Sequence, residues 1–154
     1  MSALSAGAPA PDFELTDQHG NPVRLSDYRG KSAVVVYFYP KDDTTGCTIE
    51  ACRFRDDFDK FHATGAVVIG ISDDSTESHS RFASKHQLPF TLLSDKGGRV
   101  RKLFGVRKTF GVIPGRVTFV IDRNGIVRHV FSSQSSPARH VEEALVGLAL
   151  AAGK

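Results

Sequence analysis

The 154-residue sequence predicts an α/β fold in which a central mixed β-sheet is flanked by helices and preceded by an N-terminal β-hairpin. Residues 33–39 and 67–72 are continuous apolar runs, typical of strands that are buried on both faces of a sheet. Between these runs, apolar residues recur at spacings of four and three, which is typical of an amphipathic helix. Near the end of the chain, Asn124 and Gly125 separate two alternating segments and predict an antiparallel hairpin.

The first half of the chain supplies the hairpin, the first two buried strands and the longest predicted helix. Residues 13–15 and 23–25 flank a polar turn and form the predicted N-terminal hairpin. The strand over residues 33–39 ends at Pro40. A helix is predicted over residues 46–64, and Gly65 ends it. One face of that helix carries its apolar residues: Cys47, Ala51, Phe54, Phe58 and Phe61.

The second half of the chain continues the alternation and then changes to the hairpin. Ser75 is a predicted N-cap for a helix that runs to about residue 86, and residues 90–94 form a third strand. A short helix over residues 99–104 follows, and then the hairpin strands. Ser136 and Pro137 begin a C-terminal helix. Parallel strands joined by helices, then an antiparallel hairpin, predict a thioredoxin-like arrangement in one domain, residues 1–154.

Composition excludes several classes of protein. No apolar run approaches the roughly 18 residues that span a bilayer, so we expect no contact with a membrane. Residues 1–11 contain no Lys or Arg and no apolar core, so they are not a secretory signal. The net charge is +3, and its densest basic stretch, residues 99–102 with Arg107 close behind, has no interleaved aromatics. We therefore interpret it as a solvated helix face, and expect no nucleic-acid partner.

Two cysteines with no sign of export point to a reducing compartment, where thiols are catalytic, redox-active or metal-binding more often than structural. We expect the cytoplasm, or the plastid interior if a transit peptide was removed.

Cys47 lies in the most informative segment, residues 39–52, which leaves a buried strand and enters the first turn of a helix. In open α/β folds, ligands bind beyond the carboxyl ends of strands. Unpaired backbone N–H groups and the helix dipole at this place favour the thiolate over the thiol. The polar loop puts Cys47 at the mouth of the core, so we interpret it as a reactive thiolate rather than a small buried hydrophobe. Thr44 can present its hydroxyl to the sulfur or to an incoming oxygen, and Pro40 can shield the sulfur from water.

Cys52 leaves the apolar face of the same helix, which is unusual for a structural cysteine. At 100° per residue it lies near 140° from Cys47, whereas the apolar residues lie within about 40°. On an intact helix the two Cα atoms stand roughly 8.7 Å apart, and a disulfide seldom tolerates more than about 7 Å. A bridge between these thiols therefore requires the start of the helix to unwind, which costs little compared with opening the core.

The residues around Cys47 also carry a resemblance to a known family. Pro40, Thr44, Cys47 and Glu50 fit the pattern Pro-x-x-x-Thr-x-x-Cys-x-x-Glu, which resembles the active site of the peroxiredoxins. The position of Cys52 is similar to the bacterioferritin comigratory protein or peroxiredoxin Q subfamily, where Gly-Cys-Thr-x-Glu-Ala-Cys is typical.

The likeness extends beyond this motif. Residues 9–13, 110–122 and 140–145 also resemble that subfamily, so the resemblance covers nearly the whole chain.

The resemblance implies a thioredoxin-fold peroxidase that reduces hydroperoxides and needs no metal or organic cofactor. It implies that Cys47 is the peroxidatic cysteine, oxidised to a sulfenic acid, and that Cys52 resolves it as an intramolecular disulfide. Thioredoxin or a similar dithiol protein would be the reductant, and the chain would be a monomer or a weak dimer. Arg116 matches the family arginine that contacts the reacting cysteine and peroxide, where a cation stabilises the thiolate and the developing oxyanion. Glu50 can orient Arg116 by an ion pair. Thr45 stands where many relatives have proline, which loosens the loop but removes no catalytic group.

Two other kinds of chemistry also use pairs of cysteines. A thioredoxin-type disulfide reductase normally uses Cys-x-x-Cys, and the four intervening residues here match it poorly. A metal site could join Cys47 and Cys52 to histidines such as His62 and His79, but these histidines lack the close paired spacing of zinc ligands. We therefore expect all six histidines at the surface: His19, His62, His79, His86, His129 and His140. A serine hydrolase has no support, since the Gly-x-Ser-x-Gly motif is missing from the sequence.

Overall fold

The structure, a computed structural model, describes residues 4–106, 108–109 and 113–152. Seven strands form one mixed sheet in the order β2-β1-β5-β4-β3-β8-β9. They are β1 (Glu14–Asp17), β2 (Pro22–Arg24), β3 (Val34–Phe38), β4 (Val67–Ser72), β5 (Thr91–Ser94), β8 (Val117–Ile121) and β9 (Val127–Ser132). Two short strands, β6 (Lys108–Thr109) and β7 (Ile113–Pro114), pair separately. Arg107, in the basic stretch, and Phe110, at the start of the segment 110–122, lie outside the described residues.

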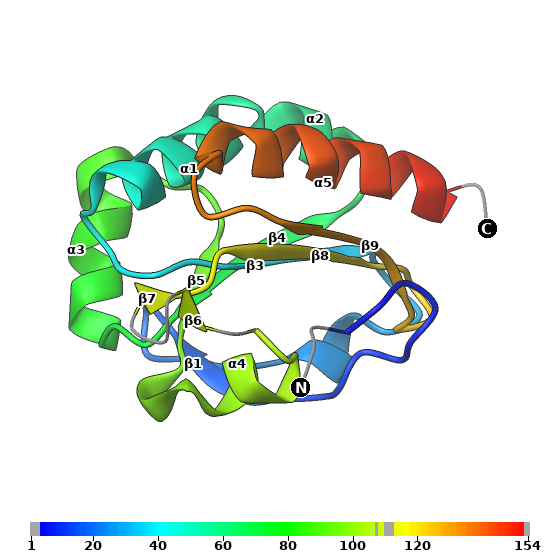
Figure 1. The fold of residues 1–154 in the computed structure, drawn as a ribbon, viewed down its shortest axis with the longest axis horizontal. Coiled ribbons are helices and arrows are strands. Elements are labelled where there is room, and N and C mark those ends of the chain that lie inside the picture. The colour runs from blue at the N-terminus through cyan, green and yellow to red at the C-terminus, as the bar shows by residue number, and fades with distance from the viewer. Residues whose placement is uncertain (1–3, 107, 110–112, 153–154) are drawn as a thin grey trace.

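Helices cover both faces of the sheet. They are α1 (Thr45–Asp56), α2 (Phe58–Ala63), α3 (Thr76–His86), α4 (Arg99–Leu103) and α5 (Pro137–Ala152), with short 3-10 helices η1 (Leu25–Tyr28) and η2 (Lys96–Gly98). In Figure 1, α1, α2 and α5 lie together on one side of the sheet and α4 lies on the other. One buried apolar cluster packs on each face, because the residues of β3 alternate between the two.

The predicted fold class is confirmed. All five residues of β3 are buried, as the continuous apolar run predicted, and β3 pairs in parallel with β4, which pairs in parallel with β5. The hairpin of β8 and β9 is antiparallel, and β1 and β2 form the N-terminal hairpin. Ser75 caps α3 as expected, since its hydroxyl accepts a hydrogen bond from the backbone N–H of Ser78 at 3.1 Å.

The helix that was predicted over residues 46–64 is interrupted. α1 ends at Asp56, and α2 begins at Phe58 after Asp57 leaves the helical conformation. The carboxylate of Asp57 lies 3.2 Å from the guanidinium of Arg53 and 3.8 Å from the ammonium of Lys60, and these pairs stabilise the bend. Apolar spacing alone does not reveal this interruption, because Phe54 and Phe61 are fully buried on either side of it.

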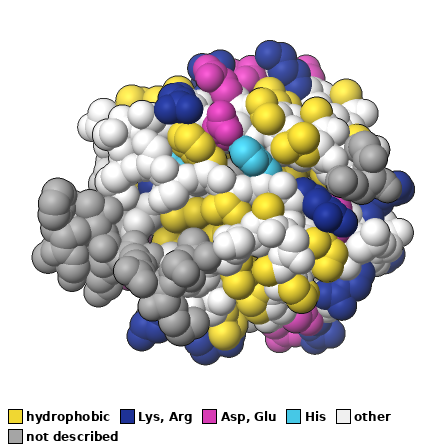
Figure 2. Space-filling model, turned by 45° about the vertical axis from the view of Figure 1, so that its right-hand side comes forward, with side chains coloured by type: hydrophobic (Ala, Val, Ile, Leu, Met, Phe, Trp, Pro, Cys, Tyr) yellow, Lys and Arg dark blue, Asp and Glu magenta, His cyan; other side chains and the backbone are white. Residues whose placement is uncertain are grey.

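The basic stretch at α4 differs from the prediction in one residue. Arg99 and Lys102 are exposed, but Arg101 is buried, with 5% of its surface accessible. The carboxylate of Asp95 accepts hydrogen bonds from the backbone N–H groups of Val100 and Arg101, which orients α4 so that position 101 faces inward. Basic side chains on the face shown in Figure 2 form separate small groups with acidic side chains near them, rather than a continuous stripe. None of the helices in the described residues combines the length and apolar composition that crossing a bilayer requires.

The register of β8 against β3 brings distant residues together at one edge of the sheet. Phe38, the last residue of β3, pairs with Val117, the first residue of β8. Arg116 therefore lies beside the point where the chain leaves β3 and turns into the loop before α1. A residue far along the sequence is in this way placed at the start of α1.

Candidate active site

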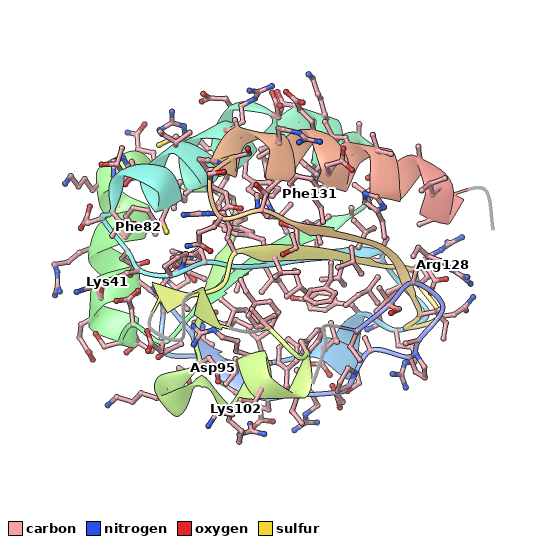
Figure 3. All side chains as sticks on the ribbon, viewed as in Figure 1. Lys41, Phe82, Asp95, Lys102, Arg128 and Phe131 are labelled. Atoms are coloured by element: carbon pink, nitrogen blue, oxygen red, sulfur yellow. The ribbon has the colours of Figure 1, made fainter. Side chains whose placement is uncertain are left out.

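Cys47 is the third residue of α1, directly beyond the carboxyl end of β3. Its side chain is buried, with 1% of its surface accessible, and it packs in the core cluster beneath α1. Thr44 precedes the helix in an extended conformation, and its carbonyl accepts the backbone N–H of Thr48 at 2.9 Å. The loop before α1 lies at the end of the molecule that α3 covers: Figure 3 labels Lys41 in this loop beside α3, and Arg128 at the opposite end.

Arg116 and Glu50 form a buried ion pair next to this thiol. The Nη1 of Arg116 donates to Oε1 of Glu50 at 2.6 Å, and the exposed fractions of the two side chains are 5% and 0%. Burial opposes the charge of Arg116, but the negative charges of Glu50 and the Cys47 thiolate outweigh it and raise the pKa of Arg116 above its ordinary value. The ion pair that the sequence suggested is therefore present, and it lies against the sulfur.

Gly46 allows the guanidinium to come this close. A Cβ atom at position 46 would stand 2.9 Å from Nη2 of Arg116, closer than real Cβ contacts. Because Arg116 is buried and held by Glu50, it has little room to withdraw. The close approach of Arg116 therefore explains why position 46 is a glycine, which the neighbouring sequence alone does not reveal.

Glu50 holds its proton more tightly than an ordinary carboxyl group. Burial raises the pKa of Glu50 from 4.5 to about 8, against the lowering influence of Arg116. Its second oxygen, Oε2, has no hydrogen-bond partner among the described residues, and it lies 3.7 Å from Nδ1 of His140. A buried carboxyl group with one free oxygen is well placed to hold a proton there.

We expect Glu50→Gln to remove a pH dependence of stability. Since the pKa of Glu50 is about 8 in the folded chain and 4.5 is its ordinary value, the folded state holds a proton that the unfolded chain releases between these values. That stability is present at acid pH and is lost as pH rises through about 8. Between about pH 5 and the folded pKa of about 8, the free energy of unfolding should fall by about 1.4 kcal/mol per pH unit more steeply in the wild type than in the variant, and the two slopes should converge at more alkaline pH. Urea unfolding of both proteins measures this, and parallel slopes would contradict it.

Thr44 and Pro40 lie in the loop between β3 and α1. The hydroxyl of Thr44 donates to the carbonyl oxygen of Lys41 at 2.9 Å. A hydroxyl that donates to a carbonyl keeps its lone pairs, so Thr44 can accept a hydrogen bond from an incoming ligand. Pro40 is half-buried where β3 ends, between the core and this loop.

Cys52 lies on α1 away from the buried face, as the helical rotation predicted. It is half-buried, and both cysteines are free thiols. Ala51 and Phe54, its neighbours on the helix, are fully buried. Cys52 is therefore at the border of the core rather than in it.

Two of the six histidines correct the expectation that all of them are at the surface. His79 and His140 are both fully buried. Each has its two ring nitrogens within hydrogen-bond distance of protein groups, which offsets the cost of burial. The spacing of three between His79 and Phe82 on the inner face of α3 was a signal for the first of them.

His140 is a neutral imidazole beside the Glu50 pair. Burial, opposed by the carbonyl of Ser133 and aided by the charges of Arg116 and Arg139, lowers the pKa of His140 to about 4. The Nε2–H of His140 donates to the Ser133 carbonyl at 2.8 Å, and the Thr118 hydroxyl lies 2.8 Å from Nδ1.

The described residues contain one group of potential metal ligands, and neither cysteine belongs to it. Asp42, Asp74 and His79 have ligand atoms that lie within 4.8 Å of one another. These atoms are engaged in hydrogen bonds within the protein. His62, the other histidine considered as a ligand, is exposed on α2.

Comparisons with known proteins agree with this site. Residues 6–130 match the AhpC/TSA family. The chain is 54% identical over 146 residues to chloroplastic peroxiredoxin Q of Sedum lineare, covering 94% of this chain and 78% of that protein. It is 52% identical over 143 residues to chloroplastic peroxiredoxin Q of Oryza sativa subsp. japonica, covering 92% of this chain and 65% of that protein.

Solved structures agree as well. The peroxidoxin BcpB of Mycobacterium tuberculosis superimposes with a TM-score of 0.87 at 40% identity, covering 97% of each chain. The bacterioferritin comigratory protein of Xanthomonas campestris gives 0.84 at 31% identity, covering 97% of this chain and 98% of that one. The chain therefore belongs to the AhpC/TSA family, within its peroxiredoxin Q and bacterioferritin comigratory protein group.

Proposed function

We propose that this chain is a thiol-dependent peroxidase that reduces hydrogen peroxide and organic hydroperoxides at Cys47. The observation that carries the proposal is the thiol in the first turn of α1 with the buried guanidinium of Arg116 against it. The thiolate attacks one peroxide oxygen, so that an S–O bond forms while the O–O bond breaks. The sulfur is oxidised to a sulfenic acid, and the leaving oxygen takes a proton and departs as water or an alcohol. The Xanthomonas campestris relative is described by its alkyl peroxide reduction activity, which supports this reaction class.

Arg116 supplies a fixed positive charge at the place where negative charge is held and develops. Its guanidinium stabilises the thiolate and then the oxygen that leaves. Because Glu50 has its pKa raised to about 8, near neutral pH it leaves much of the charge of Arg116 for the sulfur. Glu50 fixes the guanidinium through the 2.6 Å contact. Thr44 accepts a hydrogen bond from the bound peroxide, and Pro40 keeps bulk water from the thiol.

Cys52 resolves the sulfenic acid. Its thiolate attacks the sulfur of Cys47, so that an S–S bond forms and water leaves. The separation of the two thiols on an intact helix exceeds what a disulfide tolerates, so the start of α1 unwinds. Phe54 marks the other end of this change, since its ring stacks on Tyr37 at 4.6 Å and lies within 6.1 Å of Phe90. These contacts fix the remainder of α1 to the core.

A dithiol protein such as thioredoxin completes the cycle by reducing the disulfide. No cofactor takes part in this proposal, because every electron passes through sulfur. We propose a reducing compartment for the chain: the two curated relatives described above are named as chloroplastic proteins, which favours the plastid interior over the cytoplasm. A monomeric state stays a prediction from the resemblance.

Mass spectrometry after one equivalent of hydrogen peroxide tests the assignment of the sulfurs. In the wild type, the peptides that contain Cys47 and Cys52 should be joined by a disulfide. A circular dichroism spectrum of the same sample should show a loss of helical signal. Oxidation confined to other residues would overturn the proposed function, and a disulfide with an unchanged spectrum would overturn the unwinding step.

We expect Cys52→Ser to separate the first step from the second. The variant should consume one equivalent of peroxide at the wild-type rate, because Cys47 and Arg116 are unchanged. Turnover with thioredoxin should then fall by at least about tenfold, since no internal thiolate is left to form the disulfide. Excess peroxide should drive Cys47 to the sulfinic acid. Stopped-flow consumption and intact mass measure these steps, and steady turnover at the wild-type rate would show that Cys52 is not the resolving thiol.

A further inference from the structure

A buried polar cluster that the peroxide chemistry does not use joins the loop before α1 to helix α3. Asp42, Tyr39 and His79 form its centre, and the exposed fractions of these residues are 5%, 1% and 0%. The Tyr39 hydroxyl donates to Oδ1 of Asp42 at 2.6 Å, and the Ser78 hydroxyl donates to Oδ2 at 2.8 Å. The Nδ1 of His79 lies 2.7 Å from the same Oδ2. Asp42 stands five positions before Cys47, so this cluster fixes the segment that leads to the thiol.

The hydrogen-bond pattern determines where protons must lie. The Nε2 of His79 is 3.0 Å from the carbonyl oxygen of Leu93, which can only accept, so Nε2 carries a proton. In a neutral imidazole, Nδ1 would then turn a lone pair toward a carboxylate oxygen at 2.7 Å, which is repulsive. A second proton on Nδ1 converts this contact into a charge-assisted hydrogen bond. With Asp42 ionised, this geometry points to an imidazolium at His79.

The partners of Asp42 indicate that its carboxyl group is the ionised member of the pair. Burial, and next the negative charge of Asp42, raise the pKa of Tyr39 well above its ordinary value, so the phenol keeps its proton and donates it. Ser78 donates to the other carboxylate oxygen. Two hydroxyl donors together with one imidazolium N–H satisfy an ionised carboxylate.

The same loop is held at two further points. The backbone N–H of Asp42 donates to Oδ2 of Asp74 at 2.8 Å, and that oxygen also accepts the Ser72 hydroxyl at 2.7 Å. Asp43 adopts a φ of 61°, which is unfavourable for a residue with a side chain, and its carboxylate lies 3.3 Å from the ammonium of Lys85 on α3. A strained backbone persists only where its surroundings hold it in place. Helix α3 thus fixes the loop by two successive acidic residues.

We propose that His79 is a positioning residue for the Cys47 thiol, which it holds in place as a buried imidazolium paired with Asp42. The inference rests on the proposed peroxidase function. α1 begins at Thr45, three residues after Asp42. A displacement of the backbone at position 42 therefore also displaces the first turn of α1, which carries Cys47. A displacement of about 1 Å at a reacting group lowers rates by up to about two orders of magnitude.

Nuclear magnetic resonance of the reduced, 15N-labelled full chain tests the charge of His79 directly. In the wild type at neutral pH, both ring nitrogens of His79 should show the shifts of an imidazolium. In Asp42→Asn, the amide can donate to Nδ1, so His79 should become the neutral tautomer with its proton on Nε2. A neutral His79 in the wild type would overturn the proposal, whatever the variants do.

Stopped-flow kinetics tests the effect on the thiol. His79→Gln should lower the rate constant for oxidation of Cys47 by hydrogen peroxide by about tenfold, because glutamine carries both N–H donors on one nitrogen and lacks the positive charge that pairs with Asp42. Asp42→Asn, which keeps a hydrogen bond to the ring, should retain more of the rate than His79→Gln. His62→Gln, at an exposed histidine on α2, is the matched control and should react as the wild type does. If the wild type reacts with peroxide and His79→Gln reacts at the same rate, the positioning role is wrong and the peroxidase function stands. If the wild type does not react, the peroxidase function is wrong.

Discussion

Cys47→Ser is expected to abolish peroxidase turnover, lowering it by at least about three orders of magnitude. A serine hydroxyl is not ionised near neutral pH, so neither the start of α1 nor Arg116 can make it a nucleophile toward an O–O bond. The substitution removes one sulfur from a buried site and replaces it with a smaller hydroxyl, and the carboxyl and guanidinium groups beside it stay paired. The loss should therefore arise from chemistry rather than from unfolding. A coupled assay with thioredoxin, thioredoxin reductase and hydrogen peroxide measures turnover.

Cys52→Ser is the matched control for this prediction, because it removes the other sulfur of the same helix. Both variants keep one thiol, yet only the one that retains Cys47 should consume an equivalent of peroxide. Circular dichroism of the two reduced variants should show the same helical content. If Cys47→Ser still turned over while Cys52→Ser did not react, the roles of the two thiols would be exchanged. Peroxide consumption by both variants would overturn the assignment of Cys47 as the thiol that reacts with peroxide.

The sequence predicted those parts of the fold and site that depend on local pattern. β3 was evident because all its side chains are buried, so its hydrophobic run is continuous. Pro40, Thr44, Cys47 and Glu50 lie within eleven consecutive residues, so their proximity follows from one turn of chain and the first turns of a helix. What the apolar pattern missed is the break at Asp57, because the apolar residues on either side of it are buried alike.

The parts that were missed depend on contacts between distant segments. Arg116 was singled out through the family resemblance, because its place beside Glu50 depends on the register of β8 against β3. A shift of that register by one residue would turn its side chain to the opposite face of the sheet. The burial of His79 and His140 likewise depends on partners that lie 37 and 22 positions away, Asp42 and Thr118. A polar residue is buried where its hydrogen bonds are satisfied, and only the folded chain shows which partners meet.

Arg116→Ala should slow the oxidation of Cys47 by about two to three orders of magnitude, comparable to the loss of a principal charge-stabilising donor in other enzymes. It should also move the pH dependence of this oxidation upward, because more alkaline solution is needed to ionise a thiol that lacks a neighbouring cation. Arg116→Lys should fall between the two proteins, since a lysine keeps the charge but not the forked geometry that reaches both Glu50 and the sulfur. Stopped-flow oxidation across a pH series measures both effects.

Loss of the guanidinium also leaves Glu50 without its partner, so a folding defect must be separated from a catalytic one. Because burial raises the pKa of Glu50 to about 8 even beside Arg116, this carboxyl group is protonated near neutral pH once the cation is gone, and the cost is that of an unsatisfied buried polar group, about 1–3 kcal/mol. In the double variant Arg116→Ala with Glu50→Gln, the amide cannot ionise, so at alkaline pH the double variant should be more stable toward urea than Arg116→Ala without regaining the rate. Arg24→Ala, at an exposed ion pair with Glu14, should change neither quantity. A double variant that recovered both stability and rate would show that Arg116 acts on the fold rather than on the sulfur.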